Sequence, residues 1–148
     1  GTHEDKSELY QIPYKNMVRH MFGMPDDASF DMLYDNLKHQ ETISFWSTSF
    51  LRGTTLDDAI VIVDECQNLN FHELDSIITR VGQDSKIVFC GDVNQSDLQR
   101  TNERNGILDF QRILEGMDEF SMVEFGINDI VRSGLVKSYL ISKMTLGL

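Results

Sequence analysis

Two short stretches of this chain end in polar residues that could act on a phosphate. The first, AIVIVDECQN, runs from Ala59 to Asn68, and the second, KIVFCGDVNQSD, runs from Lys86 to Asp97. In each stretch, bulky apolar residues lead directly into acidic or amide side chains. Buried parallel strands deliver carboxylates in this way to the carboxyl edge of an α/β sheet, where ligands bind. Together the two stretches indicate nucleotide hydrolysis.

The first stretch has the pattern of a Walker B motif. Asp64 follows four aliphatic residues, and one Asp at the end of a rigid strand is suited to anchor Mg²⁺, which keeps several waters and takes few protein carboxylates. Glu65 projects differently from the same strand end, so it is the candidate base for the water that attacks a γ-phosphate. The alternative is an acidic pair that ends an ordinary strand, and the second stretch favours the nucleotide interpretation.

The second stretch contains a GDxxQ pattern made by Gly91, Asp92 and Gln95. The amide of Gln95 is both a donor and an acceptor, so it can contact a γ-phosphate or the attacking water and register the departure of that phosphate. The alternative is a simple turn, in which Gly91 allows a tight bend and Asp92 or Asn94 bonds the backbone. Its position after a second apolar strand favours the nucleotide role.

Arg132, in DIVRSGLV, lies just ahead of the last predicted helix. A guanidinium placed there could stabilise charge on a transferring phosphate as an arginine finger does, within the chain or across a subunit boundary. The alternative is a surface Arg near a helix start. Arg52, in FLRGTT, is a similar but weaker candidate.

The loop that cradles the phosphates in such enzymes is missing from this sequence. No GxxxxGK[ST] occurs in the 148 residues, although that glycine-rich loop supplies most of the phosphate contacts in P-loop proteins. We therefore expect this chain by itself to bind ATP weakly or not at all. It begins with Gly1, which agrees with a start partway through a longer polypeptide and equally with a processed or engineered start.

Composition limits the class of protein and its partners. The 41% hydrophobic content predicts one sizeable core. The net charge of −11 disfavours a broad cationic surface for nucleic acid, although a local patch stays open. Two cysteines are too few for a disulfide framework or a zinc site. With no signal peptide and no apolar run of membrane length, we expect a soluble, cytoplasmic protein without membrane contact.

Alternating apolar patterns predict an α/β fold with a mostly parallel sheet and flanking helices. A capping-box pattern at Asn70 and Glu73 begins one helix, and Gly82 is interpreted as its carboxyl-terminal cap. The opening residues 1–9 are interpreted as a surface loop. The predicted helices span residues 14–22, 29–37, 71–81, 107–117 and 135–140, and the predicted strands span 42–50, 59–63, 87–90 and 121–125.

With DECQN, FHELDSIITRVG, KIVFCGDVNQSDL and DIVRSGLV in this order, the chain resembles the PhoH-like family of P-loop ATPases from about Leu51 to Val136. These motif sequences are most similar to those of phage-encoded members. The resemblance implies a RecA-like core related to superfamily 1 helicases, ATP with Mg²⁺, a link to RNA or single-stranded DNA, and ring-like homo-oligomers in the bacterial cytoplasm. It also implies that Asp64 and Glu65 form Walker B, that Gln95 lies in the motif III loop, and that Arg132 is the finger.

The resemblance further implies one partial P-loop NTPase domain that is incomplete at its amino terminus and forms the carboxyl-terminal portion of an ATPase. Residues 1–41 would be a helical lead-in, and residues 42–148 would carry the Walker B, GDxxQ and arginine-finger half of the core. The P-loop strand would lie mid-sheet beside the GDxxQ strand, and its absence would leave two apolar strand edges unpaired. The alternative function is a noncatalytic interaction module derived from a P-loop NTPase that lacks the phosphate-binding loop.

Overall fold

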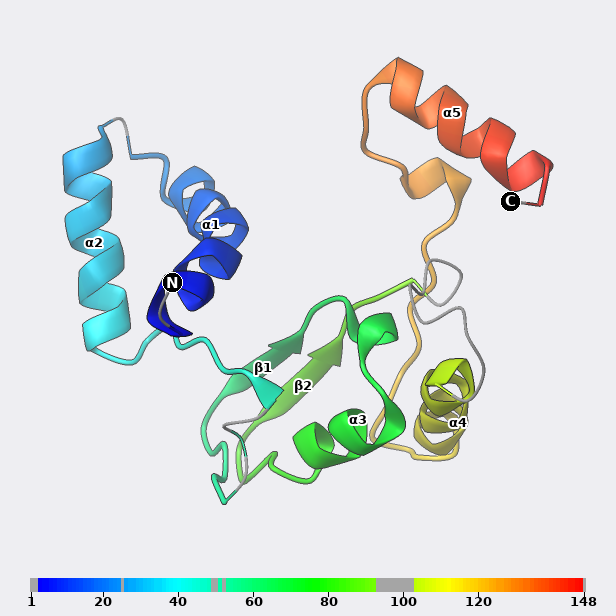
Figure 1. Ribbon diagram of the computed structural model, residues 1–148, viewed down its shortest axis with the longest axis horizontal. Helices are drawn as coiled ribbons and strands as arrows, with labels where there is room; N and C mark the ends of the chain where they lie inside the picture. The colour runs from blue at the N-terminus through cyan, green and yellow to red at the C-terminus, as the bar shows by residue number, and fades with distance from the viewer. Residues whose placement is uncertain (1–2, 25, 49–50, 52, 93–102, 148) are drawn as a thin grey trace.

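The structure is a computed structural model that describes the chain apart from residues 1–2, 25, 49–50, 52, 93–102 and 148. Its elements mix helices with a small sheet, as the alternating sequence pattern predicts (Figure 1). In chain order they are α1 (His3–Phe22), α2 (Asp27–His39), β1 (Ile60–Val63), the 3₁₀ turn η2 (Cys66–Asn68), α3 (Phe71–Ile78), β2 (Lys86–Phe89), α4 (Glu103–Glu115), the 3₁₀ turn η4 (Ile127–Asp129) and α5 (Gly134–Thr145).

The two strands β1 and β2 pair in parallel, with Ile60 opposite Lys86 and Val63 opposite Phe89. The chain leaves the carboxyl end of β1, passes through α3 and returns to the end of the sheet where β1 begins. This is the crossover that parallel pairing requires. Among the described residues each strand pairs only with the other, so both outer edges of the sheet are open. The predicted parallel sheet is confirmed for this pair of strands.

The core lies on one face of the sheet, where α3 and α4 pack (Figure 1). Rings contact one another there, with Phe89 and Phe110 edge to face at a centroid distance of 5.0 Å. Full burial of an aliphatic side chain stabilises the fold by about 1.5–3 kcal/mol, so this layer anchors the strands. Its buried members are Leu51, Val63, Cys66, Leu74, Ile77, Ile107, Phe110 and Leu114.

The opposite face of the sheet is open to solvent. Ile60, Ile62 and Val88 point to this side and are 73%, 67% and 46% exposed. Parallel sheets ordinarily have both faces covered, and the sequence predicts flanking helices. Within the described part of the chain, the helices cover only one face.

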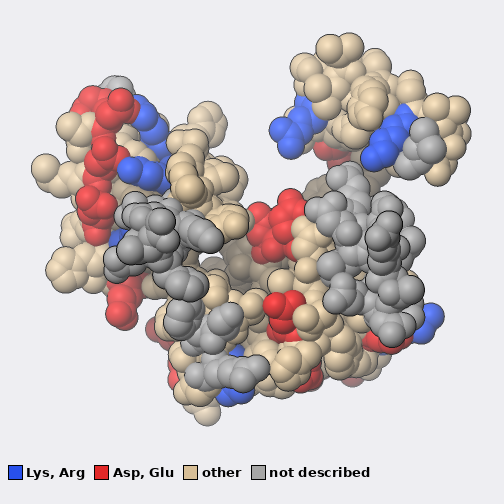
Figure 2. Space-filling model, viewed as in Figure 1, with Lys and Arg blue, Asp and Glu red and all other residues tan. Residues whose placement is uncertain are grey.

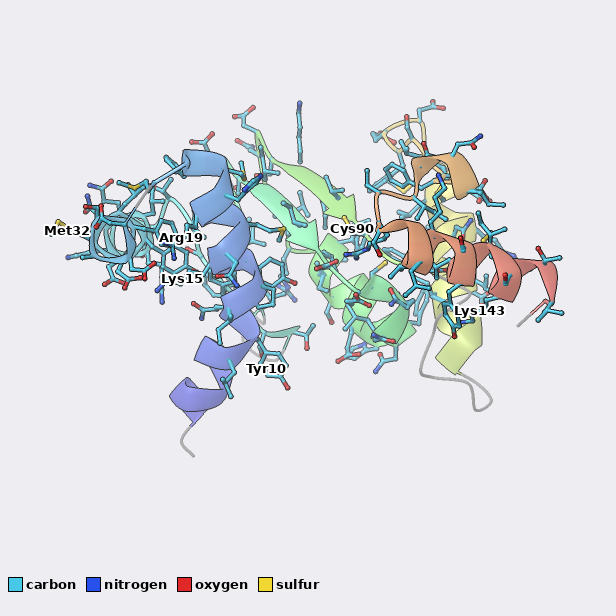
Figure 3. All side chains as sticks on the ribbon, turned by 90° about the horizontal axis from the view of Figure 1, so that it is seen from above. Tyr10, Lys15, Arg19, Met32, Cys90 and Lys143 are labelled. Carbon is cyan, nitrogen blue, oxygen red and sulfur yellow. The ribbon has the colours of Figure 1, made fainter. Side chains whose placement is uncertain are left out.

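The first two helices pack against each other, and cations from α1 join them. Lys15 lies 2.6 Å from Asp31 Oδ1 and 5.3 Å from the centroid of the Tyr34 ring, and Arg19 pairs with Asp27. Figure 3 shows Lys15 and Arg19 on the side of α1 that faces α2. Phe30 and Tyr34 of α2 are buried, so this helical pair has an aromatic centre of its own.

Four predictions about the elements are wrong in the structure. The opening is helical from His3 rather than a loop, because charged residues with good helix propensity suit an exposed helix as well as a loop. Residues 42–48 of the predicted strand 42–50 form no strand, and neither do residues 121–125. Alternating apolar residues favour extended backbone, but a strand needs a partner at its edge.

Gly82 is the fourth correction, since it does not cap α3. That helix ends at Ile78 with Thr79 as its cap. The Gly82 amide instead donates to Leu56 O at 2.8 Å, and a Cβ at Gly82 would lie 1.9 Å from Asp57 Oδ1. A glycine suits this position because the Asp57 side chain, which accepts from the Gln83 amide, occupies the space that a Cβ would need.

The predicted capping box of α3 is confirmed. The Glu73 amide donates to Asn70 Oδ1 at 3.0 Å, and the Asn70 amide donates to Glu73 Oε2 at 3.0 Å. We expect Asn70→Ala to lower the free energy of unfolding by about 1 kcal/mol, because a helix amide loses its acceptor. Urea denaturation measures this, and Asn16→Ala on the exposed side of α1 is the control, with a change of less than about 0.5 kcal/mol. Equal losses in both variants would contradict the capping role.

Candidate functional site

The parallel register of β1 and β2 places the polar loops that follow them at the same end of the sheet, where both strands have their carboxyl ends. Backbone pairing continues just beyond the strands, because the Cys90 amide donates to Val63 O at 2.8 Å and the Cys66 amide donates to Cys90 O at 2.9 Å. Figure 3 shows Cys90 at this end of the sheet. The acidic residues that follow β1 are therefore held beside the chain that follows β2.

Asp64 is exposed, and both of its carboxylate oxygens accept hydrogen bonds. The hydroxyl of Tyr14 donates to Oδ2 at 2.8 Å, and the Glu65 amide donates to Oδ1 at 3.0 Å. The bond to Asp64 is the main cause that raises the pKa of Tyr14 to about 12, and burial of the ring adds to it. Sequence reasoning missed Tyr14, because no local signal connects position 14 with position 64.

Tyr14 is held over the end of β1 by its own packing. Its ring lies 5.8 Å from the Phe45 ring, centroid to centroid, at an interplanar angle of 49°. Helix α1 therefore contacts the candidate site through the Tyr14 hydroxyl, and the Phe45 ring supports the Tyr14 ring. A ligand of Asp64 must share the carboxylate with this hydroxyl or displace it.

Glu65 has a strained backbone. Its φ of 52° and ψ of 37° lie in the left-handed region, which costs a non-glycine residue about 1–2 kcal/mol. The turn begins η2 and brings the Gln67 side chain back to Glu65, where Gln67 Nε2 donates to Glu65 Oε2 at 2.5 Å. Strain of this kind persists where surrounding contacts hold it, and such positions cluster at functional sites.

Gln67 is the buried polar residue of the site. It is 4% exposed, and among the described residues it is the one amide or charged side chain that is buried. Its Oε1 accepts from the Asp92 amide at 3.2 Å, while its Nε2 binds Glu65. The sequence analysis assigned no role to Gln67. The signal that could have identified it is an amide side chain two residues after Glu65.

The thiol of Cys66 is buried beside these carboxylates. Burial raises its pKa, and the nearby Cys90, Asp64 and Glu65 act in the same direction. Both cysteines are free. A thiol with a raised pKa stays protonated at neutral pH, so Cys66 acts in packing rather than as a nucleophile.

The remaining predicted site residues lie elsewhere or outside the described residues. Gln95 and Arg52 belong to the ranges that the structure does not describe. Arg132 is exposed between η4 and α5. The roles assigned to Gln95 and Arg132 stay predictions.

A metal at this site would have few protein ligands. Within the ranges that the structure describes, no three His, Cys, Asp or Glu side chains are grouped closely enough to hold a metal ion. The exposed Asp64 carboxylate is a hard oxygen donor, and Mg²⁺ accepts one or two carboxylates with waters and substrate phosphates. The chemistry of this carboxylate therefore fits Mg²⁺ held jointly by protein, water and phosphate.

Comparison with known proteins identifies the family. The family model described as "PhoH-like protein" matches residues 1–142. This chain belongs to the PhoH-like family. The match includes α1 and α2 as well as the stretch from about Leu51 to Val136 that carries the motifs, so the resemblance found in the sequence is confirmed and extended.

Relatives with similar sequences are longer than this chain. A PhoH-like protein of Bacillus subtilis (strain 168) is 37% identical over 136 residues, which cover 92% of this chain and 40% of the relative. A PhoH-like protein of Mycobacterium leprae (strain TN) is 37% identical over 114 residues, 74% of this chain and 32% of the relative. Protein PhoH of Escherichia coli (strain K12) is 34% identical over 92 residues, 62% of this chain and 26% of the relative. The chain spans less than half the length of these relatives.

In the parts of the chain that the structure describes, no helix is both long enough and apolar enough to cross a bilayer.

The contact between Tyr14 and Asp64 predicts a titration. We expect the pKa of Tyr14 to be about 12 and to fall toward 10 in Asp64→Asn, because the negative acceptor is lost. Since the folded-state pKa is raised, this contact stabilises the fold fully below pH 10 and loses its contribution between pH 10 and 12. NMR of ¹³C-labelled tyrosine measures the titration.

The matched control for this titration is Asp75→Asn, on the exposed side of α3. It removes one carboxylate from the chain without touching Tyr14. An equal fall in the Tyr14 pKa in both variants would show that net charge, and not the hydrogen bond, controls this group.

Proposed function

We propose that this chain forms part of the ATP-hydrolysing site of a PhoH-like ATPase with a RecA-like core. The observation that carries the proposal is the shared sheet edge, where Asp64 and Glu65 after β1 lie beside the chain that leads into GDxxQ after β2. Ligands of open α/β sheets bind at the carboxyl ends of the strands. Membership of the PhoH-like family supports the same function.

Each side chain would have a separate role in ATP hydrolysis. Asp64 would hold Mg²⁺ through its exposed carboxylate, and the bound ion would neutralise charge on the ATP phosphates. Glu65 would orient the attacking water and accept its proton. Gln95 would contact the γ-phosphate or that water, and Arg132 would stabilise charge on the transferring phosphate, within the chain or from a neighbouring subunit.

In this proposal the phosphate-binding loop belongs to another part of the complete protein. No GxxxxGK[ST] occurs in these 148 residues, and the chain covers 40% of the Bacillus subtilis relative. Additional elements would also account for the open edges of the two-stranded sheet and for its uncovered apolar face. The open edge of β2 is the position expected for the strand that precedes a P-loop.

Coupling of hydrolysis to RNA or single-stranded DNA, ring-like assembly and a cytoplasmic location in a bacterial cell, with a phage gene as one source, belong to the same proposal. Charge limits the form of any nucleic-acid contact. On the face that Figure 2 shows, acidic side chains dominate over α2, while basic ones gather in small groups at the α1–α2 pair and at α5. A net charge of −11 favours a local contact over a broad one.

The test uses the protein translated from the complete reading frame that contains these residues. We expect Mg²⁺-dependent ATP hydrolysis, and we expect Glu65→Gln to lower kcat at least about 100-fold because the water loses its base. Steady-state phosphate release measures kcat for the wild type and for Glu65→Gln. Glu119→Gln, at an exposed position, is the control, and its kcat should equal that of the wild type.

Two outcomes would contradict the proposal. Hydrolysis that survives Glu65→Gln unchanged would remove Glu65 from the chemistry. A complete reading frame without GxxxxGK[ST], whose product fails to bind ATP, would favour the noncatalytic interaction module, which retains the core and lacks the phosphate-binding loop.

A further inference from the structure

We propose that Gln67 is a positioning residue that holds Glu65 and the chain after β2 in one fixed arrangement. Its buried amide joins the two, since Nε2 donates to Glu65 Oε2 at 2.5 Å and Oε1 accepts from the Asp92 amide at 3.2 Å. This inference rests on the proposed function, because it assigns to Gln67 the placement of the proposed base.

Burial makes the link specific. Gln67 is 4% exposed, so its amide cannot exchange these partners for water without a cost. Leaving a buried donor or acceptor unsatisfied costs about 1–3 kcal/mol, which favours the one rotamer that satisfies both partners. The Glu65 carboxylate is consequently held from inside the protein, on the side of the core.

The backbone of Glu65 needs such support. Its left-handed conformation, with φ of 52°, is unfavourable for a residue with a side chain. The bond from Gln67 acts on the carboxylate, and the bond from the Glu65 amide to Asp64 Oδ1 acts on the backbone. The two bonds together support the left-handed turn at Glu65.

Gly91 shows how closely the second loop is packed on this amide. A Cβ at Gly91 would lie 2.5 Å from Gln67 Oε1 and 2.8 Å from Cys66 Sγ. The backbone of Gly91 does not adopt a left-handed φ. Gly91 is therefore needed for close approach to Gln67 rather than for a left-handed turn.

The consequence for the proposed enzyme is that Glu65 keeps its place relative to the chain that follows β2. Without the Gln67 amide, the Glu65 carboxylate would lose this support. Placement of a reacting group within about 1 Å controls rates by up to about 100-fold, so a single amide bond is sufficient for this control.

The first experiment compares steady-state kinetics of the complete protein with those of Gln67→Leu. Leu has a similar volume and forms neither hydrogen bond. We expect kcat to fall between about 10-fold and 100-fold, with the KM for ATP within about 2-fold of the wild type, because the base is misplaced while ATP binding is kept. A raised KM with an unchanged kcat would overturn the inference.

Gly91→Ala provides a second route to the same defect. The added methyl group pushes the Gln67 amide aside without removing it. A Cβ at Gly91 would also meet Cys66 Sγ at 2.8 Å, but the Gln67 link is already lost in Gln67→Leu. The part of the Gly91→Ala defect that acts through this amide should therefore not recur in the double variant, which should be slower than the slower single variant by less than the full Gly91→Ala factor. Multiplied defects in the double variant would show that the two residues act separately, and would overturn the link.

Ile77→Val is the matched control for stability. Ile77 is buried in the core and has no polar contact with the site. This substitution should lower the free energy of unfolding by about 0.5–1.5 kcal/mol and leave kcat unchanged. A fall in kcat equal to that of Gln67→Leu would mean that loss of stability explains the defect, and would overturn the positioning role.

Hydrogen exchange tests the link without relying on hydrolysis. In Gln67→Leu the Asp92 amide should exchange faster than in the wild type, while the Cys90 amide, which donates to Val63, should keep its rate. Unchanged exchange at Asp92 would overturn the inference. A wild-type protein without ATPase activity would overturn the proposed function, whereas activity lost in Glu65→Gln and kept in Gln67→Leu would overturn the inference alone.

Discussion

The parallel pairing of β1 with β2 is the contact on which the rest of this structure depends. It places the residues after both strands at one edge, and the pairing continues through Cys66 and Cys90 into the loops themselves. The strands are short and have only each other as partners among the described residues, so their order comes from the core that α3 and α4 build on one face. The site is therefore only as well ordered as that single apolar layer.

Local patterns predicted the parts of the fold that local physics determines. The aliphatic runs of β1 and β2 and the capping box at Asn70 all depend on residues close in sequence, and the structure contains each of them. The strands predicted at 42–50 and 121–125 failed in their described residues because a strand forms only where an edge is available. Gly82 was misinterpreted for a similar reason, since its neighbour Asp57 is remote in sequence.

The residues of the candidate site also fall into two groups, those that the local sequence predicts and those that it does not. The positions of Asp64 and Glu65 at a strand end follow from the aliphatic run before them. Tyr14 could not be found, because a helix 50 residues away must fold back before its hydroxyl meets Asp64. The left-handed backbone of Glu65 was equally hidden, since Glu gives no signal for such a conformation. Gln67 lay inside the motif, but only its burial and its contact with Asp92 show that it is more than a polar neighbour.

The two adjacent carboxylates have different side-chain partners, and this difference affects how each carboxylate responds to a ligand. Asp64 takes its side-chain partner from the partly exposed Tyr14, whose hydroxyl can be replaced by water at little cost. Glu65 takes its partner from a buried amide, which loses a hydrogen bond if the carboxylate moves. Asp64 is thus free to adjust to an incoming cation while Glu65 keeps its position. A site that recruits a mobile metal–nucleotide complex and then activates a water needs this division, because the ligand of the metal must adapt and the base must not.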